Sequence, residues 1–488
     1  MKIKNLLVPF MIGLIGIFAF APFSFKPLIF ISYAYLINIL LHEKDSRFLK
    51  VISWGLGHWG FGMSWIIVSV YYYGETSILL SSAIFVSLVL ILSIVFTCPV
   101  LLIKTYLEKL NITSKYTTTL VVSSLLVISE LSRYYLLNGV PWLIPGNIYL
   151  DTITQNIYPL FGVTAASLLI YIFCTCLVVF YDKKKVFFSI IFILIISLIP
   201  NYKSLNEIKD GTMISIIQPS SDPFLKYEKD YYNQIEKNLI SMITLASESS
   251  EIIVLPEAEL PYPIKSNKFS KFLSKIPKSE KLVMGAWDYH NNSVFNTIYS
   301  INTMDSYKKT HLVPFGEYIP FFENLRGIID FFDLPMSNVS HGLKNQPNIK
   351  INKDISVASP ICFDIAFPNT VRKMNKSSLL MINVSNDTWF GNSIGPYHHL
   401  SIARIRSIEN NRWTIRATND GISAIIDNKG TIVDKINKGE TGILEAPIDL
   451  LKTNSFYNKI GYLFTYIFSF IILLITLSTY IWQKFTSK

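Results

Sequence analysis

The sequence predicts a multi-pass α-helical membrane domain joined to an exported α/β domain. Half of the 488 residues are hydrophobic and the mean hydropathy is +0.37, which is too apolar for a soluble protein of this length. Apolar runs of membrane length crowd the chain before residue 202 and recur only near its C-terminal end. Between them, short β-branched runs alternate with longer polar stretches, which is typical of an α/β domain with a buried sheet.

Eight apolar runs are long enough to be candidate membrane spans. We expect the first run to be retained, because residues 18–25 lack the small-residue cleavage pattern of a signal peptide and a second apolar run follows at once. The expected spans cover residues 5–21, 27–42, 51–70, 77–103, 117–137, 160–180, 186–200 and 457–481.

The basic residues predict the orientation of these spans. Residues 202–455 carry 28 Lys and Arg against 27 Asp and Glu, whereas the rest of the chain carries 16 against 7. If the spans alternate in direction, only Lys26, Arg133 and Lys459 of those 16 fall on the side opposite to the others. This bias predicts cytoplasmic termini, and seven crossings then place residues 202–455 on the opposite face, which in a two-membrane bacterium is the periplasm. The net charge of +10 therefore indicates topology and no nucleic-acid partner.

The expected organisation is a seven-helix membrane region at 1–201, an exported domain at 202–455, and a last span with a cytoplasmic tail at 456–488. We expect the polar segments 201–211 and 447–456 to link the exported domain to the flanking spans. In the exported domain we expect strands at 212–218, 252–256, 281–286, 295–302, 355–361, 379–384 and 422–427, and helices at 228–248, 266–277, 366–375 and 396–412.

The four cysteines differ in whether a chemical role is expected for them. Cys98, Cys174 and Cys176 lie in membrane runs, where cysteine is usually a small packing residue, and the Cys174–Cys176 pair lacks the second half of a metal site. Cys362 is the only thiol of the exported domain. An unpaired thiol in an oxidising compartment is a liability unless it is used.

Three residues of the exported domain together suggest covalent catalysis. Glu257, Lys309 and Cys362 each follow a predicted strand, where the reactive groups of α/β domains collect. Taken singly, such a Glu or Lys is usually a solvated charge and such a Cys is usually core. Together they supply a nucleophile, a base and a cation for an oxyanion, without histidine or metal.

The motifs around these residues resemble a known family. The order PEAEL at 256–260, HLVPFGEY at 311–318 and PICFD at 360–364 is similar to the nitrilase superfamily of carbon–nitrogen hydrolases. With the membrane flanks, and with the blocks at 18–28, 54–65, 129–147 and 385–396, the whole chain resembles the apolipoprotein N-acyltransferases. The resemblance implies a nitrilase-like αββα sandwich for the exported domain.

The resemblance also implies roles for individual residues. The triad is Glu257, Lys309 and Cys362, and no metal is implied. Two departures concern the nucleophile and a loop: the family often has Tyr-Glu where this chain has Phe363 and Asp364, and a Lys-Trp pair where it has Lys226 and Tyr227. The implied supporting residues are Glu317, Asn296, Phe363 and Asp364, and the implied substrate-loop residues are Tyr227, Trp389, Phe390, Gly391 and Glu409, with Phe331 and Phe332 helping to exclude water.

The implied reaction moves a fatty acyl chain from a phospholipid to Cys362 as a thioester, and then to the α-amino group of the diacylglyceryl-cysteine of an apolipoprotein. No cofactor is implied, and we expect a monomer. Glu130 and Arg133 are expected to form a structural ion pair or to meet a lipid headgroup, and His58 to be a packed, hydrogen-bonded residue.

Two other functions remain open. In a membrane-tethered amidase or nitrilase-like hydrolase, water would resolve the thioester. A transporter or channel would need charged residues along a pathway inside several spans, and these spans contain almost none beyond Glu130 and Arg133.

Overall fold

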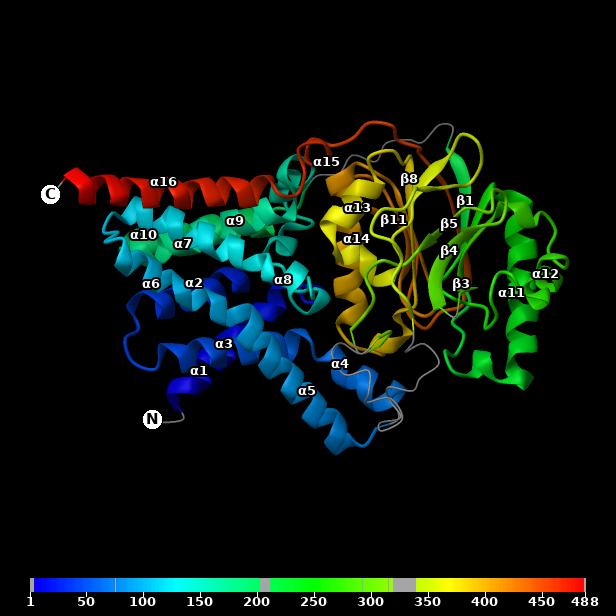
Figure 1. Cartoon of the computed structure of the whole chain (residues 1–488), viewed down its shortest axis with the longest axis horizontal. Helices are drawn as coiled ribbons and strands as arrows, with labels where there is room; N and C mark the ends of the chain where they lie inside the picture. The colour runs from blue at the N-terminus through cyan, green and yellow to red at the C-terminus, as the bar shows by residue number, and fades with distance from the viewer. Residues whose placement is uncertain are drawn as a thin grey trace.

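The computed structural model describes residues 4–74, 76–201, 211–291, 293–314, 316–318 and 339–486. Most of the expected tether at 201–211, and the expected loop residues Phe331 and Phe332, lie outside these ranges. Figure 1 shows a layer of long helices beside a domain built around two sheets, with the chain's first residues and its last helix both on the helical side.

The helical part follows the order of the eight apolar runs. Its main helices are α1 (Lys4–Ile15), α2 (Pro27–His42), α3 (Arg47–Gly62), α5 (Ile78–Leu92), α7 (Lys115–Glu130), α9 (Tyr158–Val179), α10 (Lys183–Leu198) and α16 (Phe464–Thr486). Short helices complete it: α4 (Trp65–Val68), α6 (Leu102–Lys109) and α8 (Ser132–Tyr135). Large apolar side chains point outward from this part, among them Leu79, Phe188 and Trp482. Such a surface is typical of helices that face lipid.

Three helical stretches within the described residues are long and apolar enough to cross a membrane. They are Ile78–Lys109, Ile153–Val179 and Phe464–Thr486, and shorter apolar helices cover Asn5–Ala19 and Pro27–His42. The helical character expected before residue 202 is therefore confirmed, whereas the number of eight spans stays a prediction.

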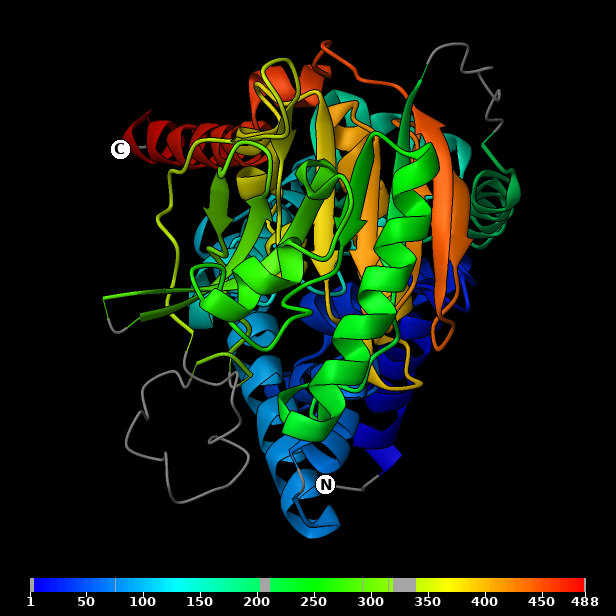
Figure 2. The ribbon, with the colours of Figure 1, turned by 90° about the vertical axis from the view of Figure 1, so that its right-hand side faces the viewer.

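The α/β part, residues 211–456, is an αββα sandwich, as the resemblance implied. Its two six-stranded sheets have the orders β12-β1-β2-β3-β4-β5 and β11-β10-β9-β8-β7-β6. Helices α11 (Lys229–Ser249) and α12 (Asn267–Leu273) cover the outer face of the first sheet, and α11 crosses that face in Figure 2. Helices α13 (Pro368–Met374) and α14 (Gly395–Asn410) lie between the second sheet and the membrane helices (Figure 1).

Each sheet has a parallel core, in which β1–β2–β3 and β7–β8–β9 run side by side. The strands of these cores are almost continuously buried, because helices cover one face and the other sheet covers the second. The strands are β1 (Thr212–Gln218), β2 (Ile252–Leu255), β3 (Leu282–His290), β4 (Ser293–Ser300), β5 (Ser306–Lys308), β6 (Ile349–Lys350), β7 (Ser356–Ala358), β8 (Leu380–Ser385), β9 (Thr414–Thr418), β10 (Ser423–Ile426), β11 (Ile432–Ile436) and β12 (Gly442–Ile448).

All seven expected strands and all four expected helices of this part are present, within a few residues. The sequence analysis missed β5, β6, β9, β11 and β12. Strands β5 and β6 are too short to show a pattern, and β11 carries charged residues on its exposed positions. Strand β9 contains Arg416, which is fully buried and so breaks the apolar run expected of a central strand.

Candidate active site

The strand ends bring the three candidate catalytic residues to one place. Glu257 follows β2, Lys309 follows β5 directly, and Cys362 opens a 3₁₀ turn, Cys362–Ala366, after β7. The first two come from one sheet and the third from the other, so the site lies where the two sheets face each other.

Lys309 lies between two carboxylates. Its Nζ is 3.0 Å from Glu257 Oε1 and 2.7 Å from Glu317 Oε1. Asn296 of β4 donates from Nδ2 to the same Glu257 oxygen at 2.6 Å. All four side chains are buried. Burial alone would lower the pKa of Lys309, but Glu257 and Glu317 outweigh it and raise that pKa well above its usual value, so the lysine stays a cation.

Backbone amides fix the second oxygen of each carboxylate. Asn386 N donates to Glu257 Oε2 at 2.8 Å, and Val313 N donates to Glu317 Oε2 at 2.8 Å. The two carboxylates are therefore held in orientation before any substrate arrives, which is what preorganised catalysis requires. Glu317 and Asn296, expected from the resemblance, lie in this cluster.

The nucleophile candidate has a strained backbone and a protonated thiol. Cys362 has φ +45°, in the left-handed region that costs a residue with a Cβ roughly 1–2 kcal/mol. Burial raises the pKa of the thiol, and Glu257 raises it further, while Lys309 counteracts both. At neutral pH the thiol therefore keeps its proton, and a base must remove it when substrate is present.

Asp364 connects the loop of Lys309 to the turn of Cys362. Its carboxylate is buried and accepts from His311 N at 2.7 Å, Tyr307 Oη at 3.1 Å and Ile361 N at 3.2 Å. Burial raises the pKa of Asp364 to about 7. Phe363, in the place of the family's tyrosine, packs its ring against Phe367 with the centroids 5.3 Å apart.

A second buried polar group lies next to Cys362, and the sequence analysis missed it. His399 of α14 lies between Asp387 Oδ1, 3.0 Å from Nδ1, and the carbonyl oxygen of Cys362, 3.2 Å from Nε2. Arg416 of β9 donates to Asp387 Oδ2 at 2.6 Å. The available signal was an acidic residue two positions after a fully buried strand, at Asp387, followed by a polar-rich helix.

This group has the donor types of a metal site but already has a cation. Possible ligand atoms of Cys362, Asp387 and His399 lie within 4.8 Å of one another. However, Asp387 already binds Arg416 and His399, and a metal ion there would face the guanidinium. We assign no metal to it.

The predicted loop residues Trp389, Phe390 and Gly391 contact the membrane helices. Ser69 Oγ donates to Trp389 O at 2.7 Å, and the Phe390 and Trp65 rings pack edge to face with their centroids 4.7 Å apart. Gly391 has φ +51°, and a Cβ on it would lie 2.6 Å from Val68 Cγ1. The 387–391 loop is thus fitted against the helical part.

Lys226 and Tyr227 form a short turn that is packed into the domain. Lys226 is fully buried and donates from Nζ to Ala258 O at 2.8 Å, one residue beyond Glu257. Its Nζ also lies 5.8 Å from the centroid of the Tyr227 ring. The substrate-loop role expected for Tyr227 stays a prediction.

Glu409 differs from its expected setting, since it lies in helix α14 and in no loop. It is fully buried, forms an ion pair with Arg406, and accepts from Val163 N of α9 at 2.8 Å. It therefore connects the α/β part to helix α9. The residue before Val163 is Gly162, which has φ +77°. A Cβ at this position would lie 2.4 Å from the ring of Tyr457, so glycine lets the chain pack closely here.

Two expectations for the membrane helices need correction. Glu130 and Arg133 do not pair with each other: Glu130 accepts from Tyr171 Oη at 2.6 Å, and Arg133 donates to Leu143 O at 2.9 Å. The i, i+3 spacing permitted an ion pair, but both groups found nearer partners. His58 is packed on Trp54, as expected, yet neither of its ring nitrogens has a hydrogen-bond partner in the described structure.

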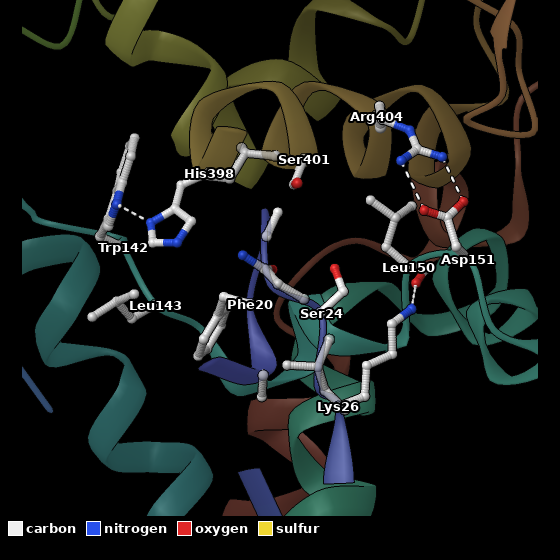
Figure 3. Close-up of a pocket in the computed structure, with 15 residues that line it drawn as sticks. Phe20, Ser24, Lys26, Trp142, Leu143, Leu150, Asp151, His398, Ser401 and Arg404 are labelled. Carbon is white, nitrogen blue, oxygen red and sulfur yellow. Dashed lines mark hydrogen bonds and ion pairs between the residues drawn. The ribbon is translucent and has the colours of Figure 1, made fainter. Parts of the chain in front are cut away.

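A cavity of about 90 Å³ lies between the two parts of the molecule (Figure 3). Its walls come from the N-terminal hairpin, the segment 142–151 and α14. Arg404 and Asp151 close one end with a two-pronged ion pair of 2.5 and 2.8 Å, and Trp142 donates to His398 Nδ1 at 3.1 Å at the other. None of Glu257, Lys309 or Cys362 lines it.

Comparisons with known proteins agree with both parts. Residues 214–457 match the carbon–nitrogen hydrolase family, and residues 12–176 match the apolipoprotein N-acyltransferase N-terminal domain. The apolipoprotein N-acyltransferase of Haemophilus influenzae is 29% identical over 504 residues, covering 97% of this chain and 94% of that protein. The one from Pseudomonas paraeruginosa is 31% identical over 457 residues, covering 88% and 87%.

Among solved structures, the C. elegans NitFhit protein aligns with 50% of this chain and 62% of its own, at 19% identity and a TM-score of 0.38.

Proposed function

Because this chain belongs to the apolipoprotein N-acyltransferase family, we propose that it transfers a fatty acyl chain from a membrane phospholipid to the N-terminus of a lipoprotein. The acceptor is the α-amino group of the N-terminal diacylglyceryl-cysteine. The observation that carries the proposal is the buried Glu257–Lys309–Glu317 cluster beside Cys362, under a loop that is fitted against the membrane helices.

The first half-reaction forms a thioester on Cys362. Glu257 accepts the thiol proton as Sγ attacks the ester carbonyl carbon of the phospholipid. Lys309 and a backbone N–H next to Cys362 stabilise the oxyanion of the tetrahedral intermediate. The intermediate then collapses, the ester C–O bond breaks, and the departing lysophospholipid oxygen takes the proton from Glu257.

The second half-reaction passes the acyl chain to the amine. The α-amino nitrogen attacks the thioester carbon and gives a proton to Glu257. The C–S bond breaks, and the sulfur takes the proton that Glu257 received from the amine, which restores both groups. Glu317 and Asn296 hold Glu257 and Lys309 in place through both half-reactions. Because the lysophospholipid leaves before the amine reacts, the kinetics are ping-pong.

Water must be kept from the thioester while an amine is admitted. Trp389 and Phe390 are suited to this task, since their side chains are large and apolar. Their rings pack against those of Tyr73 and Trp65 in the helical part. Tyr227 and Gly391 belong to the same proposed surface. We place Glu409 outside it, as a support for α14.

The proposed topology follows the charge bias. Eight spans divide the chain into a seven-helix region at 1–201, a periplasmic catalytic domain at 202–455 and a last span with a cytoplasmic tail at 456–488, in a bacterial inner membrane. Both substrates are lipids, whose acyl chains cost about 0.8 kcal/mol per CH₂ to expose to water. A catalytic mouth held at the bilayer surface avoids that cost. The enzyme acts as a monomer.

The test uses the purified full chain with a radiolabelled phospholipid and a synthetic diacylated lipopeptide. We expect an N-acylated peptide, and acyl-Cys362 on mass spectrometry when the peptide is withheld. Cys362→Ala should abolish both products, and Cys176→Ala, at a thiol of the membrane part, should leave both. Release of free fatty acid alone would support the hydrolase instead. Full activity of Cys362→Ala would contradict the catalytic assignment.

A further inference from the structure

The peptide unit that joins Cys362 to Phe363 receives a contact that the proposed mechanism does not use. His399, on α14, places Nε2 3.2 Å from the carbonyl oxygen of Cys362. The two residues are 37 positions apart in the sequence, and α14 brings the imidazole to the back of the turn that presents the thiol.

The chemistry of the partners fixes one hydrogen on this imidazole. A carbonyl oxygen can only accept, so Nε2 must carry a hydrogen and donate it to Cys362 O. His399 therefore acts on the nucleophile's carbonyl as a hydrogen-bond donor.

Three buried side chains hold the ring in this orientation. Asp387 Oδ1 lies 3.0 Å from Nδ1 and also accepts from Ser385 Oγ at 2.7 Å. Arg416 Nη2 lies 2.6 Å from Asp387 Oδ2 and 3.1 Å from His399 Nδ1. Burial alone would raise the pKa of Asp387, but Arg416 and His399 outweigh it and hold that pKa below its usual range. The carboxylate thus stays charged beside the ring.

The peptide that His399 contacts is strained and chemically important. Cys362 has φ +45°, so the orientation of its carbonyl is not one that the residue would adopt without support. The same peptide plane carries the N–H of Phe363, the first amide after the nucleophile. The hydrogen bonding of the 3₁₀ turn begins one residue later, with Asp364 N donating to Ile361 O, so the turn leaves the Phe363 N–H available.

A hydrogen bond to the carbonyl acts on the amide of the same unit in two ways. It fixes the rotation of the peptide plane, and therefore the direction of the N–H. It also polarises the unit, which makes that N–H a stronger donor. Both effects increase with the rigidity of the donor, and the Asp387–Arg416 pair provides that rigidity.

We propose that His399, held by Asp387 and Arg416, is a positioning residue that orients the Cys362–Phe363 peptide so that the Phe363 N–H donates to the oxyanion of both tetrahedral intermediates. The inference rests on the proposed thioester mechanism and names the side chain that orients its backbone donor. It predicts that loss of His399 slows the steps that pass through an oxyanion and spares those that need only a reactive thiol.

The experiment compares two rates on the full chain in lipid nanodiscs. The first is the rate of acyl-Cys362 formation from phospholipid, followed by mass spectrometry and resolved into kcat and KM. The second is the rate of Cys362 alkylation by iodoacetamide, a displacement that forms no tetrahedral oxyanion. The variants are His399→Ala, which removes the donor, and His399→Gln, whose amide N–H can reach Cys362 O. His290→Gln is the matched control, since that histidine is exposed at the end of β3.

We expect His399→Ala to lower kcat about 100-fold, the usual effect of losing one oxyanion donor. KM and the alkylation rate should change less than about 3-fold, because the lipid contacts and the thiol are kept. His399→Gln should recover most of kcat, and His290→Gln should match the wild type. Asp387→Asn, which loosens the ring without removing it, should lower kcat to an intermediate value.

Several results would overturn the proposal. Unchanged kcat in His399→Ala would refute it, and so would a parallel fall of kcat and alkylation rate, which indicates loss of local structure. If His399→Ala fails to fold, Asp387→Asn decides between the same two results. If the wild type itself forms no acyl-Cys362, the proposed function fails and the role of His399 fails with it, whereas a normal wild type with unchanged His399→Ala refutes the role of His399 alone.

Discussion

Burial and the neighbouring carboxylate of Glu257 keep the resting Cys362 thiol protonated. Burial raises its pKa, Glu257 raises it further, and Lys309 acts in the opposite direction. This arrangement protects Cys362, because a protonated thiol reacts slowly with oxidants and alkylating agents. The same carboxylate becomes useful when a substrate carbonyl arrives to receive the sulfur.

This arrangement predicts an unusual response of Cys362 to pH. Since the thiol pKa lies above its ordinary value, alkylation by iodoacetamide should increase about tenfold per pH unit and reach no plateau by pH 9. Glu257→Gln removes a negative charge, so it should lower the pKa of Cys362 and speed alkylation several-fold at pH 8 while abolishing acyl transfer. Lys309→Met should slow both.

The measurement is the rate of mass increase at Cys362 in a Cys98→Ala background, which removes a half-buried thiol of the helical part. If Glu257→Gln slowed alkylation as strongly as transfer, Glu257 would activate the resting thiol directly.

Parts of the site were predictable from single residues, and parts were not. Glu257, Lys309 and Cys362 could be found because each follows a strand within an uncommon motif. The Asp387–His399–Arg416 group could not, because its members come from a loop, a helix and a strand that meet only after the sheets pack. Arg416 also hides β9, since a buried arginine within TIRAT resembles an exposed strand residue until its partner Asp387 is known.

Among the elements, the 387–391 loop is the clearest case of local geometry that serves the site. Glycine is required at position 391 for two reasons. The backbone has a positive φ there, and the side chain of Val68 approaches too closely to admit a Cβ. Gly391→Ala should therefore displace Trp389 and Phe390 and lower acyl transfer about tenfold, with a smaller effect on the melting temperature.

Two variants separate the causes. Gly439 has φ +82° but open space around its Cα, so Gly439→Ala measures backbone strain alone. Adding Val68→Ala to Gly391→Ala should restore part of the activity, because it removes the atom that the new Cβ would meet. No restoration in the double variant would show that contact with α4 is irrelevant.

The loop that follows Lys309 predicts a second effect, in acid. His311 stacks on Phe367 with centroids 3.6 Å apart, and burial lowers the pKa of His311 to about 4. The unfolded chain, with a histidine pKa of about 6.5, binds this proton more readily. Its contribution to stability is therefore complete above pH 6.5 and is lost as the pH falls towards 4, about 2 kcal/mol by pH 5.

His311→Gln keeps a hydrogen-bond partner for the Thr370 hydroxyl, which His311 contacts in the wild type. The variant removes the imidazole that takes up the proton. Melting temperatures of wild type and variant between pH 5 and 8 should converge at low pH and diverge at neutral pH, with the wild type then the more stable. A difference that does not depend on pH would contradict the assignment, and the comparison cancels the opposite effect of Asp364.

Across the whole molecule, α14 connects the catalytic and membrane parts. It carries His399 towards Cys362, Arg404 towards Asp151, and Glu409 towards Val163 of α9. Glu409→Gln leaves Arg406 buried without its carboxylate, which should cost about 3 kcal/mol of unfolding free energy.

Chemical unfolding of the full chain in detergent measures this cost. Glu248→Gln, at an exposed glutamate of α11, is the matched control and should behave as the wild type. Equal stability of both variants would mean that the Glu409 contacts contribute nothing to holding α14 on α9.

The contact of Phe390 with Trp65 bears on how the catalytic part can be handled outside a membrane. Expressed alone, residues 211–456 would lose the helical surface that covers Phe390, Trp389 and the buried side of α14. The isolated fragment would expose a continuous apolar surface to water and would self-associate. For this chain, solubility of the catalytic half is therefore a property of the whole, and an active soluble truncation would need that face rebuilt with polar side chains.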